Sequence, residues 1–338
     1  MIRHLNQQKA PPKVSERDIL CVEIAGLCHD LGHAPFSHVF EGFINENRRT
    51  DNKWKHEDAS CQMLDHLLKE NPHVKEKIEP DEIAFIKRLI IGESGSDERQ
   101  FLYQIINNAS YNIDVDKWDY LARDSHFLGI GKSFDHERMI KMSRVIDNEI
   151  CYRDKTVDDF YDMFYSRYRL HKTAYQHKTV LLFNKLLGEA FKSADKHLKI
   201  FEKVDDMKKF TYFTDSILEE ILKNEDNDNL KEARNKLKDI IYRSYEHKRT
   251  VGDGNDQGKE PDKKKFCDAS INYGAGEGNP LEKIPFYHKN DNKSFKYISS
   301  EEVKLEEMLL LPKKFCMNTR YYFQKESENP RKKMKANH

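Results

Sequence analysis

The chain has 338 residues, a formal net charge of +0, 34% charged residues and 38% hydrophobic residues. A chain of this length can bury a full core, and its balanced charge does not predict bulk attraction to nucleic acid, although clusters of Lys and Arg can still create local basic patches. The six cysteines form no CxxC pair, which is typical of reduced thiols in an intracellular protein. No apolar run approaches the roughly 20 residues of a membrane helix, so we expect a nuclear or cytoplasmic protein with no membrane partner.

Residues 1–14 are polar and predict an irregular segment, after which the first core helix begins. Ser15 followed by Asp18 is typical of a capping box, and apolar residues then recur at three- and four-residue spacing as far as Leu31. Gly32 can adopt the left-handed backbone conformation, so we expect it to end this helix.

A histidine-rich stretch follows the apolar helix. His29 and Asp30 lie at the predicted end of the helix, and His33 and His38 follow at once. Imidazole and carboxylate groups are common metal ligands, and imidazole is also a general acid or base near neutral pH. The simpler alternative is a helix end that carries histidine because of the helix dipole. Three histidines and an aspartate around a Gly-Pro turn favour a metal and phosphate site.

A second short helix is predicted over residues 36–45, on which Glu41 lies within side-chain reach of His38. A polar loop over residues 46–55 leads into another helix that opens with His56. His56 is a further candidate for the site, and the alternative is an exposed histidine in a first helical turn.

Residues 80–108 predict packing helices, and the next helix begins at about Asp116. It places Asp116, Tyr120 and Asp124 on one face, at i, i+4 and i+8. An acidic stripe of this kind is usually a solvated face. Because the same chain carries the His-Asp stretch, we interpret this stripe as the lining of a ligand site.

Residues 150–201 contain no proline and predict one or two long helices. Arg167, His171, Tyr175 and Lys178 recur along them as a polar stripe. Arginine offers forked donors to phosphate oxygens, lysine a point charge and tyrosine a stacking face, so the stripe suits a triphosphate and a base. A solvated helix face is the alternative.

The C-terminal third changes character. Residues 201–249 predict a helical extension, residues 250–282 a linker-like loop, and residues 283–338 a small region with a β element, a helix near 301–311 and a basic tail. The basic tail is interpreted either as a nuclear localisation signal or as a solvated chain end.

Five segments resemble the family of SAM and HD domain-containing deoxynucleoside triphosphate triphosphohydrolases, without the SAM domain. They are SERDILCVEIAGLCHDLGHAPFSHVFE, the WKHE block, IDVDKWDYLARD, RDKTVDDFYDMFYSRYRLHKTAYQHK and INYGAGEGNP. The resemblance is good over residues 15–200, where it implies a partial HD phosphohydrolase domain. The implied fold is mainly α, an HD-domain helical fold with a small, incomplete α+β C-terminal part.

The resemblance implies metal-dependent hydrolysis of dGTP and other dNTPs to deoxynucleoside and triphosphate, with roles in dNTP catabolism and antiviral defence. One divalent ion, of iron, zinc, manganese or magnesium, would polarise the α-phosphate and activate a water. The implied metal ligands are His29, Asp30 and Asp116. The implied catalytic residues are His33, His38, His56 and Glu41. Among them, His38 would donate the proton to the leaving oxygen, and Glu41 would orient His56.

The resemblance also implies binding sites for substrate and effectors. With His171 of the stripe added, the substrate-binding set is Lys117, Tyr120, Asp124, Arg167, His171, Tyr175 and Gln176. Family members are tetramers assembled by GTP and dNTP, so we expect dimers or tetramers here. The matching allosteric nucleotide-binding positions are Arg138, Arg153, Lys155, Asp159, His177, Lys178 and Arg243. The resemblance thus assigns Lys178 to an effector site, whereas the stripe alone assigned it to the substrate site. Asp159 occupies a position where the family has a neutral amide.

Two departures shape the prediction for activity. In the family, a further ligand histidine and a phosphate-binding arginine precede the His-Asp helix, and residues 1–14 do not match them. We therefore expect an incomplete member whose turnover is impaired. The alternatives are another HD-type nucleotide phosphohydrolase, which would release pyrophosphate or phosphate, and a non-catalytic subunit that binds single-stranded nucleic acid or regulates a partner.

Overall fold

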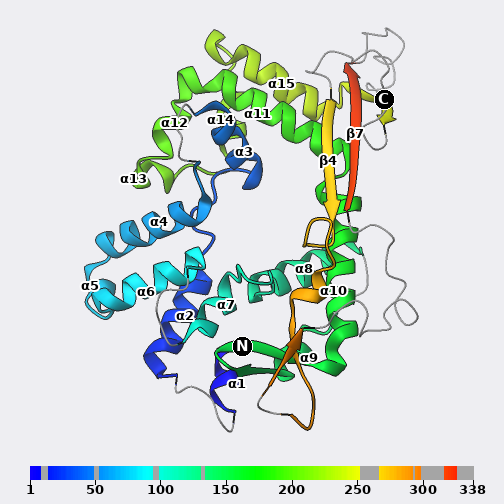
Figure 1. Ribbon diagram of the computed structural model, residues 1–338. Helices are drawn as coiled ribbons and strands as arrows, with labels where there is room; N and C mark the ends of the chain where they lie inside the picture. Colours follow the sequence, from blue (N-terminus) through cyan, green and yellow to red (C-terminus); the bar gives the residue numbers. More distant parts are fainter. Residues whose placement is uncertain are drawn as a thin grey trace. The chain divides into compact units, whose positions relative to one another are not determined.

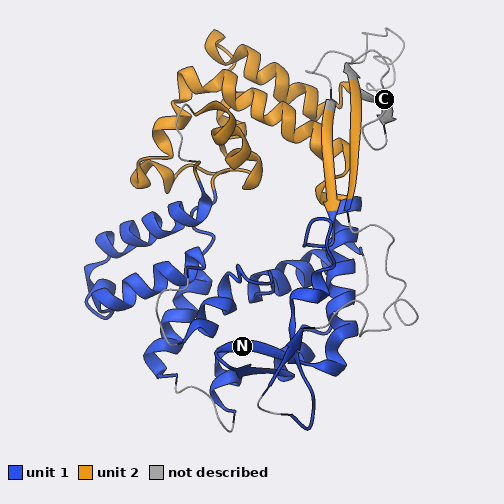
Figure 2. Cartoon of the chain, in the orientation of Figure 1, with its two compact units in different colours: residues 1–33, 55–173, 272–316 blue, residues 34–54, 174–271, 317–338 orange. Residues whose placement is uncertain are grey.

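The computed structural model describes residues 1–8, 14–48, 53–93, 99–130, 134–251, 266–291, 294–297 and 316–325. These residues are mainly helical, with two strands between residues 143 and 153 and the other strands after residue 244 (Figure 1). They form two compact units, each assembled from separated segments (Figure 2). Unit 1 comprises Met1–His33, Lys55–Thr173 and Asn272–Cys316, and unit 2 comprises Ala34–Trp54, Ala174–Ile271 and Met317–His338. No helix in the described ranges is both long enough and apolar enough to cross a membrane.

Unit 1 is a helical body with one small sheet. Its helices are α1 (Ile2–Asn6), α2 (Glu16–Cys28), α4 (His56–Glu70), α5 (Pro72–Lys75), α6 (Pro80–Ile91), η1 (Gln100–Leu102), α7 (Tyr103–Ile106), α8 (Val115–Leu128), α9 (His136–Lys141), η2 (Asp154–Thr156), α10 (Val157–Leu170) and η6 (Pro280–Lys283). Its strands are β1 (Ser143–Ile146), β2 (Glu149–Arg153), β5 (Pro285–Tyr287) and β6 (Lys296–Tyr297), in the order β1-β2-β5-β6. β2 pairs with β5 in parallel, and the other two pairs are antiparallel.

Helix α2 begins where the sequence predicts, but it ends at Cys28, before the expected end at Gly32. The Ser15 hydroxyl accepts from the Asp18 N–H and the Asp18 carboxylate accepts from the Ser15 N–H, so the capping box is present. Ile19, Val22 and Ala25 are buried, and α2 packs against α6. The apolar face of α2 thereby fixes the direction in which its C-terminal end points.

Unit 2 is built from helices that pack around a cluster of phenylalanines. Its elements are α3 (His38–Asn47), α11 (Lys178–Leu198), α12 (Ile200–Lys203), α13 (Met207–Phe210), α14 (Ile217–Lys223), η4 (Asp228–Leu230), α15 (Lys231–Ile241) and the strands β3 (Tyr245–Val251), β4 (Phe266–Asn272) and β7 (Cys316–Lys325). The ring centroids of Phe40 and Phe191 lie 5.7 Å apart, which joins α3 to α11. The strands form a sheet in the order β3-β7-β4.

The structure differs from the sequence-based expectation in two regions of unit 1. Residues 1–14 were expected to be irregular, but α1 forms and buries Ile2 and Leu5. A five-residue helix is unstable alone, so contacts with α2 and β1 must stabilise it. Residues 150–153 were expected to be helical, but they belong to β2, where Ile150 and Tyr152 are buried in the sheet.

The C-terminal third is partly as expected. The helical extension ends at α15, and residues 245–251 form β3. The expected loop over residues 250–282 contains β4, whereas β5 and β6 confirm the expected β element. The expected helix near 301–311 and the basic tail lie outside the described residues.

Candidate functional site

The His-Asp stretch forms a tight turn after α2, and α4 holds this turn from the side. The buried Ser60 hydroxyl on α4 donates to the His29 carbonyl at 2.5 Å and accepts from the Gly32 N–H at 2.8 Å. The expectation that Gly32 is left-handed is wrong, because Gly32 is not among the residues with positive φ. Glycine is required there for space, since a Cβ would lie 2.1 Å from the His56 carbonyl oxygen.

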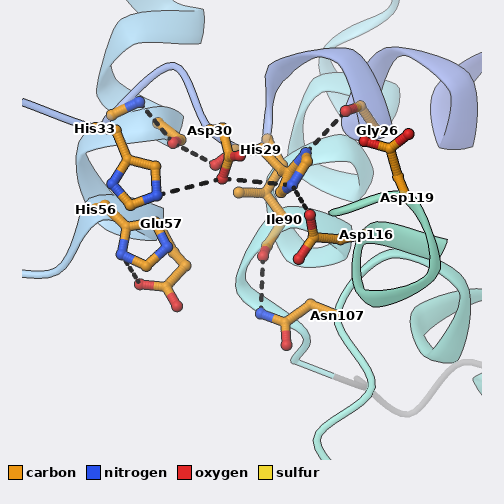
Figure 3. A network of polar contacts seen from close by, with 12 residues as sticks. Gly26, His29, Asp30, His33, His56, Glu57, Ile90, Asn107, Asp116 and Asp119 are labelled. Carbon is orange, nitrogen blue, oxygen red and sulfur yellow. Dashed lines mark hydrogen bonds and ion pairs between the residues drawn. The ribbon is translucent and has the colours of Figure 1, made fainter. Parts of the chain in front are cut away.

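Three of the predicted ligands converge beside this turn (Figure 3). His29 Nε2 lies 3.4 Å from a carboxylate oxygen of Asp30 and 3.4 Å from one of Asp116. One ligand atom from each of these side chains can be chosen so that all three atoms lie within 4.8 Å of one another. The end of α2 and the first turn of α8 therefore bring together a nitrogen and two carboxylates, as the sequence predicted.

The imidazole of His29 is oriented for ligation. Its Nδ1 lies 2.8 Å from the Gly26 carbonyl oxygen, which fixes the proton on Nδ1 and leaves Nε2 with a lone pair in the neutral ring. Nε2 is buried and has no well-formed hydrogen bond within the described part of the chain. The Asp116 carboxylate, followed by that of Asp30, outweighs burial and raises the pKa of His29 to about 9. The same carboxylates favour any cation, whether a proton or a metal ion, so the donor set fits a divalent ion.

Two further histidines lie next to the three ligands. The rings of His33 and His56 stack with centroids 4.1 Å apart, and His33 Nε2 lies 3.5 Å from the Asp30 carboxylate. His56 Nδ1 lies 3.4 Å from the carboxylate of Glu57. Glu57, which the sequence reasoning did not consider, is thus the carboxylate beside His56 within unit 1.

Helix α8 carries the predicted ligand-lining face. Asp114 caps it by accepting from the Lys117 N–H at 2.9 Å, and Lys117 itself is only 6% exposed. Burial raises the pKa of Tyr120 to about 12, so its phenol stays protonated at neutral pH. Asp124 is half-buried one turn further along.

Arg167 and His171 lie at the C-terminal end of α10 and bring positive charge towards α8. Helix α10 packs against α8, and the charge of Arg167 acts to lower the pKa of both Lys117 and Tyr120. Burial, followed by the charge of Arg167, lowers the pKa of His171 to about 4, so this imidazole is neutral at neutral pH. A π-helical turn, η3 (His171–Tyr175), follows, a feature that is frequent at functional sites.

The remaining predicted catalytic and substrate-binding residues belong to unit 2. His38 opens α3, and its Nδ1 lies 3.6 Å from the Glu41 carboxylate, as expected from their spacing. His38 also lines, with residues of α11, a pocket of about 580 Å³. Tyr175 is half-buried. The side-chain amide of Gln176 donates to the Ser270 carbonyl and accepts from the Ser270 N–H, each at 2.8 Å, so it is bonded at both ends to β4.

The predicted effector residues are also divided between the units. In unit 1, Arg138 forms an ion pair with Asp159, and Arg153 pairs with Asp154 at 2.7 Å. Lys155 is exposed in the same unit. The members in unit 2 are His177, Lys178 and Arg243.

Besides Glu57, sequence reasoning missed three other residues that support the site. Asp114 precedes a helix and could have been recognised from N-cap preference. Ser60 and Asn272 carry no local signal, because their partners are 28 to 31 and 105 residues away along the chain.

Comparisons with known proteins find similarity to one domain family and to a set of curated proteins. Residues 2–124 match the HD domain model. The chain is 36% identical to the human deoxynucleoside triphosphate triphosphohydrolase SAMHD1 over 376 residues, which cover 94% of this chain and 59% of the human protein. It is 35% identical to the Xenopus laevis protein of that name, over 94% of this chain and 60% of that protein. A Dictyostelium discoideum homologue of SAMHD1 is 38% identical over 69% of this chain and 44% of its own length. The chain thus spans at most about 60% of these curated relatives.

Proposed function

Since this chain is an HD-domain protein homologous to the SAMHD1 deoxynucleoside triphosphate triphosphohydrolases, we propose that it hydrolyses dNTPs, including dGTP, to deoxynucleoside and triphosphate. The observation that carries this proposal is the convergence of His29, Asp30 and Asp116 around the buried Nε2 of His29. A divalent ion held by these three residues would supply Lewis-acid polarisation of the α-phosphate and activation of a water.

The neighbouring side chains bind and orient the nucleotide in this proposal. Lys117 and Arg167 neutralise phosphate oxygens, and the protonated phenol of Tyr120 donates a hydrogen bond to phosphate or to the sugar. Asp124 accepts from the 3′-hydroxyl. His171 is neutral, so it contributes a hydrogen bond rather than a charge.

Proton transfer falls to the histidines. His33 and His56, stacked between Asp30 and Glu57, hold protons near the reacting phosphate. His38, with Glu41 beside it, is proposed to protonate the leaving O5′. Tyr175 is proposed to contact the sugar and base, and Gln176 to support it through β4.

Product analysis on the metal-loaded chain tests this function. We expect dGTP to yield triphosphate, and Asp116→Asn to reduce the rate by about 100-fold or more because it weakens a metal ligand. The matched control is Asp65→Asn on α4, whose exposed carboxylate pairs with Lys87 at 2.6 Å and which should retain the rate. Release of pyrophosphate or phosphate would instead identify another HD-type phosphohydrolase. Salt-sensitive binding of single-stranded nucleic acid without dNTP loss would favour a regulatory subunit.

We also propose that GTP and dNTP act as effectors. The residues proposed to bind them are Arg138, Arg153 and Lys155 in unit 1 and His177, Lys178 and Arg243 in unit 2. In the chain as it stands, the Asp159 carboxylate neutralises Arg138. Asp159→Asn should therefore bind GTP more tightly than the unmodified chain in a calorimetric titration. Asp158→Asn, an exposed change on the same helical turn, should not. Equal GTP affinity in all three proteins would contradict this assignment.

Finer properties of the relatives are extended to this chain as proposals. We propose that the metal is iron, zinc, manganese or magnesium, because imidazole and carboxylate ligands suit all four. We propose self-association to a dimer or tetramer, a nuclear or cytoplasmic location, and a part in antiviral defence through dNTP depletion. Elemental analysis, light scattering and imaging of the tagged chain test the first three, and viral replication in cells tests the last.

A further inference from the structure

The segment INYGAGEGNP contains a turn that follows β4, and the proposed function gives this turn no role. Asn272 ends β4, and Gly274 adopts φ +110°, a conformation that favours glycine. A Cβ on Gly274 would lie 3.3 Å from the ring of Phe164 on α10. The turn over residues 272–274, called the 272–274 turn below, is therefore fitted closely against α10 (Figure 1).

This turn contacts Arg167 through Asn272. Arg167 Nη1 donates to the Asn272 carbonyl at 2.7 Å and lies 3.3 Å from the Asn272 side-chain oxygen. The same side-chain oxygen accepts from the Gly274 N–H at 2.8 Å, which closes an Asx turn. The Arg167 guanidinium is thus bonded to the backbone of the 272–274 turn, and the Asx turn and the contact with Phe164 make this backbone rigid.

The turn also reaches Lys117, through Asn112. The Lys117 ammonium donates to the Asn112 side-chain oxygen, and the Asn112 amide donates to the Gly274 carbonyl at 3.4 Å. Asn112 has φ +58°, a conformation that asparagine tolerates better than most residues. One turn from the C-terminal third of the chain therefore holds two cations that lie 50 residues apart.

Holding the side chains of Lys117 and Arg167 near each other is electrostatically unfavourable, because like charges repel. The Lys117 side chain is largely buried, and the Asp114 carboxylate lies 3.9 Å from its ammonium group. Long cationic side chains lose rotamer freedom when they bind an anion. Cations that are already fixed lose less, so they bind an oligophosphate more tightly.

We propose that the 272–274 turn is a positioning device that pre-orients Lys117 and Arg167 for the oligophosphate of a nucleotide, with Asn272 as its positioning residue. The inference rests on the proposed function only for the identity of the ligand. It assigns Asn272 no contact with the reacting atoms.

The test uses the full metal-loaded chain and inorganic tripolyphosphate as the probe, with calorimetric dissociation constants and dGTP kinetics. Asn272→Ala should weaken tripolyphosphate binding about 10-fold and raise KM for dGTP to a similar extent, with kcat changed by less than about 3-fold. Asn272→Ser should restore most of the affinity, because a serine hydroxyl can accept from the N–H two residues on.

Asn279→Ala is the matched control. Asn279 also closes an Asx turn, accepting from the Leu281 N–H at 3.0 Å at the start of η6. This variant should leave tripolyphosphate affinity unchanged even where it lowers thermal stability. Equal affinity in the unmodified, Asn272→Ala and Asn272→Ser proteins would overturn the inference, as would an equal loss in Asn279→Ala.

The two proposals fail separately. If dGTP is not hydrolysed but tripolyphosphate binding depends on Asn272, the positioning role stands and the proposed function falls. If triphosphate is released from dGTP while binding is indifferent to Asn272, only the positioning role falls.

Discussion

Ser60 connects α4 to both ends of the turn that carries Asp30, through the His29 carbonyl and the Gly32 N–H. Ser60→Ala leaves both groups without this partner, so we expect metal affinity to fall about 10-fold and the free energy of unfolding to fall by about 1–3 kcal/mol. Ser125→Ala is the control, because the buried Ser125 hydroxyl has no hydrogen bond within the described ranges. Metal titration and urea unfolding measure the two quantities, and an unchanged metal affinity in Ser60→Ala would contradict the role.

A substitution at Gly32 tests the same contact between α4 and the turn, from the side of the turn. A methyl group there would meet the His56 carbonyl and, at 2.3 Å, the Ser60 nitrogen, both backbone atoms of α4. We expect Gly32→Ala to lower the free energy of unfolding by about 3 kcal/mol. Gly42→Ala on α3 has no atom within 4 Å of its new methyl group and should be neutral or stabilising by up to about 1 kcal/mol. Similar urea midpoints for the two variants would refute the close approach.

The sequence predicted the ligands of this site better than the packing of α4 against the turn that carries them. The local pattern predicted a metal site at His29 and Asp30 and a ligand-lining face that includes Asp116, and the family resemblance implied that all three residues are ligands of one ion. The role of Gly32 was predicted wrongly, because a glycine after a helix can serve either backbone conformation or close packing. Only the position of α4 decides between these two roles, and α4 comes from a later segment of the chain.

At the scale of elements, the start of α2 depends on one carboxylate. Burial raises the pKa of Asp18, but hydrogen bonds from Ser15 and the Arg99 guanidinium at 2.6 Å outweigh burial and lower it overall. A lowered pKa means that Asp18 stabilises the fold above its unfolded-state pKa of about 3.9, and that this contribution is lost as pH falls through the folded value.

Asp18→Asn should therefore lower the free energy of unfolding by about 1 kcal/mol at pH 7, and the difference from the unmodified chain should shrink towards pH 3. Glu16→Gln, on the same turn but with an exposed side chain, should change stability by less than about 0.5 kcal/mol at either pH. Urea unfolding at the two pH values provides the measurement. A difference that grows on acidification would show that the sign is wrong.

Long amphipathic helices such as α2, α8, α10 and α11 were predictable because their periodicity is local. The exceptions depend on tertiary pairing. β2 exists because β1 and β5 pair with it, and β5 lies more than 130 residues further along the chain. β4 likewise lies in a segment rich in glycine and lysine that resembles a linker.

At the scale of the whole molecule, the three proposed metal ligands all belong to unit 1. A divalent ion at 100 times its dissociation constant should stabilise that unit by about 2.7 kcal/mol. We expect Mn²⁺ to slow amide exchange in α2 and α8 and to leave α11 and α15 unchanged, with the effect reversed by a chelator. Asp116→Asn should abolish the response. Equal slowing in both units, or none, would contradict the assignment.

The interleaved segments of the two units have a consequence for biosynthesis. The first unit needs residues from both ends of the chain, and the second needs α3 near the beginning and β7 near the end. A nascent polypeptide must therefore be synthesised as far as β7 before unit 2 has all its parts, and no single proteolytic cut separates one intact unit from the other. Recombinant fragments that stop before β7 should consequently require chaperones, or should be degraded, however well their individual helices form.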